Sequence, residues 1–220
     1  MMRVCLTLLL LLAHGVAHVS EDSLAAFRDS AKVETGEALP NDMTEVTCEI
    51  RSDDPEGPQG SIVFVLREDW SPHACDAFRT RVEAKFYDGL RFFRVLPHFI
   101  AQFGFNPAWD GPKWDKVKRD ERHADALNKR GTAAFAGSSK TQIFVNTYDN
   151  KFLDKEGTAF AQVRNVALLD QLYGGYKEGS GQIKAYNRGT DALMAEFPKM
   201  SHIETCRVTH EGHHWKRALG

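Results

Sequence analysis

One arginine stands where a charge is unexpected. The segment RFFRVLPHFIAQFGF, residues 91–105, is mostly apolar and favours β-structure, and Arg94 has two large apolar residues on either side. A charge among apolar side chains costs free energy unless a partner or a function uses it. Arg94 is therefore either a strand arginine paired with a carboxylate or a charge that the protein uses in its chemistry.

A second pattern with potential chemistry is HEGHH, residues 210–214, which matches the H-E-x-x-H motif of zinc proteases. Gly212 weakens the required helix, and no third ligand follows before the chain ends. We expect no metal site and interpret residues 209–220 as a His-rich C-terminal tail that binds metal only adventitiously. The segment GGYKEGSGQ lacks the strand-helix context of a nucleotide site.

Length and composition indicate one globular domain. The chain has 220 residues, 42% of them hydrophobic, and a formal charge of −2. That size suits a single domain, and that charge leaves no basic footprint for nucleic acid. We see no internal repeat.

The first 17 residues have the layout of a secretory signal peptide. Arg3 precedes an apolar run from Val4 to Leu12, and small residues follow up to Ala17. An uncleaved anchor or a buried helix is the alternative, but the run is shorter than the roughly 20 residues that span a bilayer. We expect cleavage after Ala17 and a flexible acidic leader over residues 18–43. After cleavage the protein is expected in the ER lumen or the extracellular space, with no attachment to the membrane.

Cleavage removes Cys5 and leaves Cys48, Cys75 and Cys206. An odd number in a compartment that permits disulfides predicts one bridge and one free thiol. Cys48 and Cys206 lie in strand-like segments, whereas Cys75 lies in the first turns of a predicted helix and is the better candidate for a buried thiol. The sequence alone leaves the pairing open.

Alternating patterns and turn signals define the elements that position these residues. A helix is predicted from Pro72 to Lys85 with Ser71 as its N-cap, and a short helix at Ala167–Leu172. Strands are predicted at 44–52, 61–68, two within 91–105 separated at Pro97-His98, 131–136, 141–146, 158–163 and 202–208. Eight short strands and two helices favour a closed β-barrel, with an open sandwich as the alternative.

Five blocks in a fixed order make the pattern specific: FYDGLRFFRVLPHFIAQFG, RGTAAFA, TQIFVNTYDNKFLD, FAQV and EFPKMSHI. Together they resemble the cyclophilin-type peptidyl-prolyl cis/trans isomerases over residues 44–208. The resemblance implies a mainly β fold, a closed eight-stranded barrel capped by two α-helices. It also implies that the first and last strands are neighbours, so that Cys48 and Cys206 can form the bridge.

The resemblance assigns site residues by position. Arg94 takes the place of the catalytic arginine and Gln102 that of the catalytic glutamine. The substrate-binding residues are then Phe99, Ile100, Gln142, Phe144, Phe152 and Leu153. Rotation of an X-Pro bond makes and breaks no bond, so the family needs no cofactor; it needs an apolar pocket for the proline ring and a donor for the twisted amide.

Some positions depart from the family pattern. Only five residues separate Ala136 from Gln142, so the loop between them is short, and Phe152 replaces a tryptophan that is common there. An alternative is therefore a catalytically weak module that binds Pro-containing segments. Many family members bind the cyclic peptide cyclosporin, and the indole N–H of that tryptophan can donate a hydrogen bond to it. Phenylalanine has no such donor, so we expect weak cyclosporin binding. We expect a monomer whose partners are Pro-containing polypeptides.

Overall fold

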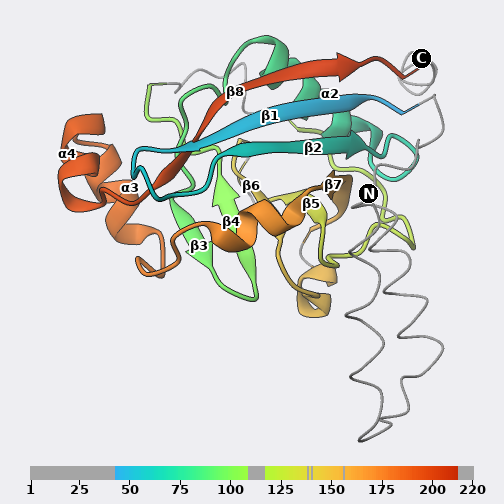
Figure 1. The fold of residues 1–220 in the computed structure, drawn as a ribbon. Helices are drawn as coiled ribbons and strands as arrows, with labels where there is room; N and C mark the ends of the chain where they lie inside the picture. The colour runs from blue at the N-terminus through green and yellow to red at the C-terminus, as the bar shows by residue number, and fades with distance from the viewer. Residues whose placement is uncertain (1–42, 109–116, 138, 140, 156, 213–220) are drawn as a thin grey trace, which may run out of the picture.

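The fold is an eight-stranded antiparallel sheet in a computed structural model that describes residues 43–108, 117–137, 139, 141–155 and 157–212. The strand order is β3-β4-β6-β5-β7-β2-β1-β8 (Figure 1). The strands are β1 (Glu45–Ser52), β2 (Gly60–Leu66), β3 (Arg94–Leu96), β4 (Ile100–Phe103), β5 (Thr132–Phe135), β6 (Ile143–Asn146), β7 (Ala159–Arg164) and β8 (Ser201–His210). They match the predicted strands within a few residues.

The barrel closes where the chain just before β3 meets β8. Phe92 donates its main-chain N–H to Ser201 at 3.0 Å, and Ile203 donates to Leu90 at 2.9 Å. An isolated bridge between Arg91 and His202 lies between these bonds. The two end strands of the sheet order are thereby joined through the backbone, and the predicted eight-stranded barrel is confirmed.

Alternating burial fills the barrel with large side chains. Along β1 every second residue points inward, as the two-residue period of a strand requires. The centre is aromatic: Phe78 of α2 (Pro72–Glu83) lies 4.9 Å from Phe64 and 5.2 Å from Phe160, measured between ring centroids. This contact fixes α2 against the barrel.

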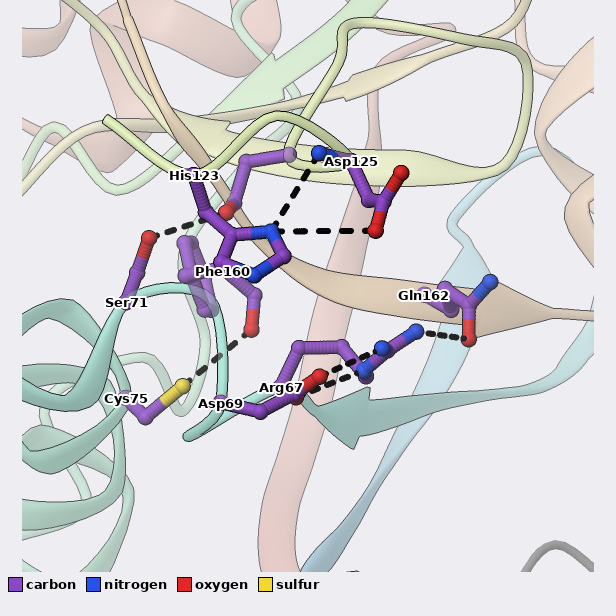
Figure 2. Close-up of polar contacts among 9 residues, drawn as sticks. Arg67, Asp69, Ser71, Cys75, His123, Asp125, Phe160 and Gln162 are labelled. Carbon is purple, nitrogen blue, oxygen red and sulfur yellow. Dashed lines mark hydrogen bonds and ion pairs between the residues drawn. The ribbon is translucent and has the colours of Figure 1, made fainter. Parts of the chain in front are cut away.

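The start of α2 is anchored differently from the prediction. Ser71 occupies the N-cap position, but its hydroxyl donates to the carbonyl of Ala159 in β7 at 3.0 Å and caps no helical N–H (Figure 2). Asp120 takes over this role, because its carboxylate accepts from the N–H groups of His73 and Ala74, each at 2.9 Å. A carboxylate here also complements the helix dipole. The cap therefore comes from a segment distant in sequence.

The later helices also differ from the prediction. The short helix predicted at residues 167–172 is the 3₁₀ helix η3 (Val166–Gln171), and the described chain adds two short α-helices, α3 (Ser180–Tyr186) and α4 (Thr190–Glu196), which were not predicted. Figure 1 shows α3 and α4 apart from α2. Three α-helices therefore accompany the described barrel instead of the expected two: α3 begins within the glycine-rich segment GGYKEGSGQ, residues 174–182, and α4 follows it, and no helix was predicted in either place.

The cysteines follow the strand pairing. Cys48 of β1 and Cys206 of β8 are register partners and form a disulfide across 158 residues of sequence. Cys75 is a buried free thiol whose Sγ donates to the carbonyl of Phe160 at 3.1 Å (Figure 2). Burial raises the pKa of Cys75 well above its ordinary value. The thiol is therefore protonated and shielded from exchange with the bridge.

The predicted boundaries are only partly within the described residues. The predicted signal peptide, residues 18–42 of the leader and residues 213–220 of the tail lie outside them. Strand β8 continues to His210, so the first two residues of the predicted tail belong to the barrel. None of the helices in the described ranges has the length and apolar character needed to cross a membrane.

Candidate active site

The hairpin of β3 and β4 sets the two predicted catalytic residues side by side. Arg94 and Gln102 are direct cross-strand partners. The turn between the strands contains His98 at φ 56°, a left-handed conformation that is uncommon for a residue other than glycine. Phe99 donates its N–H to the carbonyl of Leu96 at 3.1 Å and completes the turn. The apolar segment around Arg94 is thus a tight hairpin on the barrel.

A chain of hydrogen bonds runs outward from Arg94. Its Nη1 donates to Oε1 of Gln102 at 3.3 Å, and Nε2 of Gln102 donates to Oε1 of Gln142 at 2.9 Å. Gln142 directly precedes β6, which pairs with β4 and places Phe144 opposite Gln102. These bonds set the orientation of both amides, and the amide nitrogen of Gln142, which has no hydrogen-bond partner among the described residues, is left as a donor at the end of this chain of bonds.

Beside this chain lies a small apolar cavity of about 150 Å³. Ile100 and Phe144 are buried in its wall, and Phe99 and Leu153 pack against them, with Leu153 supplied by the 3₁₀ helix η2 (Lys151–Lys155). The guanidinium carbon of Arg94 is 5.6 Å from the centroid of the Phe99 ring. The cavity therefore combines an apolar wall with one cation at its edge.

Six of the eight predicted site residues line this cavity: Arg94, Phe99, Ile100, Gln102, Phe144 and Leu153. Gln142 reaches the site only through its bond to Gln102. Phe152 does not line the cavity; it is 66% exposed and stacks on the outer side of Phe99 at 5.6 Å between centroids. Phe152 thus extends the aromatic surface beyond the cavity.

The short loop after β5 forms part of the cavity wall. Ala136 donates its N–H to the carbonyl of Gln142 at 2.9 Å, and Ser139 closes the turn by accepting from the N–H of Gln142 at 3.0 Å. Ala136 and Gly137 then face the cavity. The short loop therefore keeps β5 and β6 in register and still contributes to the site.

The charged partner of Arg94 was not predicted from the sequence. Glu178 accepts a hydrogen bond from Nε of Arg94 at 2.8 Å. The hydrogen bond and the charge of Arg94 together lower the pKa of the Glu178 carboxyl. The sequence contains only a weak signal for it, since Glu178 lies in the glycine-rich segment and 84 residues from its partner.

The histidine motif has no counterpart within the described ranges. His210 is the last residue of β8, whereas His213 and His214 lie outside the described part. Among the described residues, no group of three or more His, Cys, Asp or Glu side chains is arranged to hold a metal ion. The helix that an H-E-x-x-H zinc site requires is therefore not formed at His210, which is the extended last residue of β8.

The chain is similar to known isomerases over most of this barrel. The family model described as "Cyclophilin type peptidyl-prolyl cis-trans isomerase/CLD" matches residues 47–185. A peptidyl-prolyl cis-trans isomerase of Helicobacter pylori is 29% identical over 120 residues, which cover 52% of this chain and 74% of the relative. One from Acinetobacter baylyi is 30% identical over 127 residues, 55% of this chain and 63% of the relative.

A third relative is the peptidyl-prolyl cis-trans isomerase-like 1 of Gibberella zeae, 27% identical over 134 residues, which cover 57% of this chain and 82% of the relative. The matched family range includes β2 to β7, and therefore the whole β3–β4 hairpin and the cavity beside it. The chain is an isomerase that belongs to the cyclophilin-type peptidyl-prolyl cis-trans isomerase family.

Proposed function

We propose that this isomerase acts on X-Pro bonds of polypeptides in the secretory pathway or outside the cell, as a monomer and without a cofactor. The observation that supports the site most directly is the position of Arg94 at the edge of the apolar cavity, tied to Gln102. A proline ring is compact and apolar and suits such a cavity, while its amide lies at the edge beside the cation.

The chemistry follows from amide resonance. Resonance holds the barrier to rotation at about 18–20 kcal/mol, and it is lost when the bond twists. The prolyl nitrogen then becomes a better hydrogen-bond acceptor. The guanidinium of Arg94 donates to it, which stabilises the twisted state more than either planar state and so lowers the barrier. The apolar wall holds the ring, and the amides of Gln102 and Gln142 bind the substrate backbone.

Two observations support the compartment. Residues 1–17 have the layout of a signal peptide, and the bridge between Cys48 and Cys206 suits an oxidising environment, because cytosolic proteins rarely keep structural disulfides. Expression in a secretory host followed by mass measurement of the product tests this part. A mature chain that begins at His18 is expected; retention of the full N-terminus in the cytosol would contradict it.

Replacing Arg94 tests the activity itself. Removal of one donor to a developing charge typically costs roughly 100- to 1000-fold in rate. We expect Arg94→Ala to lower kcat by that order and to leave KM nearly unchanged, since the contact is made mainly in the twisted state. Arg94→Lys keeps the charge but loses the planar fork of donors, and it should stay impaired. An NMR exchange assay on a Pro-containing peptide measures both.

The matched control is Arg51→Ala, because Arg51 also pairs through Nε with a glutamate, on the face of β1 and β8. Circular dichroism checks folding in each variant. A folded Arg94→Ala protein with wild-type turnover would refute the catalytic role. A wild-type protein that binds the peptide without accelerating its isomerisation would instead favour a binding module, the alternative that the short Ala136–Gln142 loop supports.

A further inference from the structure

Glu178 lies against the catalytic hairpin although it comes from a segment far along the chain. The segment 174–179 runs along β3: a Cβ added to Gly174 would lie 2.7 Å from the Pro97 ring, and one added to Gly179 would lie 2.8 Å from the Phe93 ring and 3.2 Å from Cβ of Arg94. Only glycine allows such a close approach at these positions. The packing brings the Glu178 carboxylate to the guanidinium.

Two contacts on different nitrogens hold the guanidinium of Arg94. Nε donates to Oε2 of Glu178 at 2.8 Å, and Nη1 donates to Oε1 of Gln102 at 3.3 Å. A planar group held at two of its nitrogens can rotate little about its own side chain. The third nitrogen, Nη2, has no hydrogen-bond partner among the described residues, which leaves it as a donor for a substrate.

The contact of Glu178 with Arg94 affects the orientation of the guanidinium more than its electrostatic environment. The side chain of Glu178 is 68% exposed, so water screens its electrostatic effect on Arg94. Arginine side chains are long and lose considerable rotamer freedom when fixed. An acceptor that fixes the guanidinium in the free enzyme removes that cost from the catalytic step.

We propose that Glu178 is a positioning residue of this active site: by accepting from Nε, it holds Arg94 with Nη2 directed toward the substrate amide. This rests on the proposed function, in which Arg94 donates to the twisted amide. It adds the segment before α3 to the hairpin, β6, η2 and the loop after β5, which form the rest of the site. The role requires an acceptor oxygen at this place, and it does not require the negative charge.

Variants that remove the acceptor oxygen of Glu178 can be compared with one that removes only its charge. Glu178→Ala removes the acceptor, and we expect kcat to fall roughly tenfold with KM changed less than twofold, because misplacing a catalytic group is costly even when it remains present. Glu178→Gln keeps a side-chain oxygen at the same length, and it should restore most of the lost turnover. Glu178→Asp is shorter by one methylene and serves as a second loss variant if the alanine protein does not fold.

The chain offers a matched control. Glu204 accepts from Nε of Arg51 through its own Oε2, as Glu178 does from Arg94, but on the face of β1 and β8. Glu204→Ala should leave kcat at the wild-type value. The NMR signal of the Arg94 Nε–H reports the contact directly; it should move in Glu178→Ala and remain close to its wild-type position in Glu178→Gln and in Glu204→Ala.

The outcomes separate the two proposals. If Arg94→Ala loses turnover while folded Glu178→Ala keeps the wild-type kcat, the positioning role is wrong and the proposed function stands. A rise in kcat in Glu178→Ala would also overturn it, because the carboxylate would then restrain Arg94. Equal losses in Glu178→Ala and Glu178→Gln would show that the charge acts, not the acceptor. If Arg94→Ala keeps its activity, the proposed function itself fails.

Discussion

Reduction of the Cys48–Cys206 bridge should remove a large share of the stability of this domain. The bridge spans 158 residues, almost the whole barrel. In the chain-entropy model, a loop of that size lowers the entropy of the unfolded chain by about 17 cal/mol/K, or about 5 kcal/mol at 25 °C. Domains of this kind are stable by about 5–15 kcal/mol in total. The reduced protein should therefore unfold far more easily.

We expect the native contacts around the bridge to change little on reduction, because both cysteines are buried in the paired strands β1 and β8. The effect should therefore appear in the unfolding equilibrium and hardly in the site, which lies on β3 and β4. Urea titration of oxidised and reduced protein measures it. With a dependence of about 2–3 kcal/mol per molar urea, we expect the midpoint to fall by about 2 M.

A double variant, Cys48→Ala with Cys206→Ala, provides the control for the reductant. Its urea midpoint should be low and the same with or without reductant, since Cys75 is buried and unpaired. Isomerase turnover of the reduced protein, measured under conditions where it stays folded, should equal that of the oxidised protein. A loss of less than about 1 kcal/mol on reduction would refute the reasoning, because the bridge would then not restrict the unfolded chain as the model requires.

Three further outcomes are expected. Asp120→Ala should lower the free energy of unfolding, measured by urea titration, by about 0.5–2 kcal/mol, because it leaves two N–H groups of α2 uncapped. Asp125→Ala should have little effect in the same titration. Burial and the charge of Arg91 lower the pKa of His202, so the unfolded chain binds the proton more readily; stability should fall as the pH drops below about 6.5, and His202→Gln should weaken this dependence in urea titrations at pH 5 and 7. Phe152→Trp should tighten cyclosporin binding by about 1 kcal/mol in calorimetry through one added N–H donor, and equal affinities would contradict that account.

The sequence predicted the elements that carry their own local signal. The β3–β4 hairpin was predicted because apolar strand patterns flank Pro97-His98, and the family resemblance then assigned Arg94 and Gln102, which the hairpin indeed brings together. The disulfide needed the resemblance, since only the neighbourhood of the first and last strands selects Cys206 as the partner of Cys48.

The features that were missed depend on tertiary contacts. The helices α3 and α4 have seven residues each and no side-chain cap, and isolated helices of that length are not stable in water. Packing holds them, because Ala185 and Tyr186 of α3 and Leu193 of α4 are buried in the hydrophobic core. Glu178 and Asp120 could not be assigned either, because each acts on a group more than 40 residues away in sequence.

The pairing of β1 with β8 also brings the two ends of the described barrel to one place. Glu45 lies opposite His210, and Gly212 donates its N–H to the hydroxyl of Thr44 at 3.1 Å. The first and last residues of the described domain are therefore close enough for circular permutation. A short linker could join them while new ends are opened in the β1–β2 loop near Glu56, which is exposed. For the same reason the barrel is suited to insertion as a unit into a surface loop of another protein, which it would enter and leave at neighbouring points.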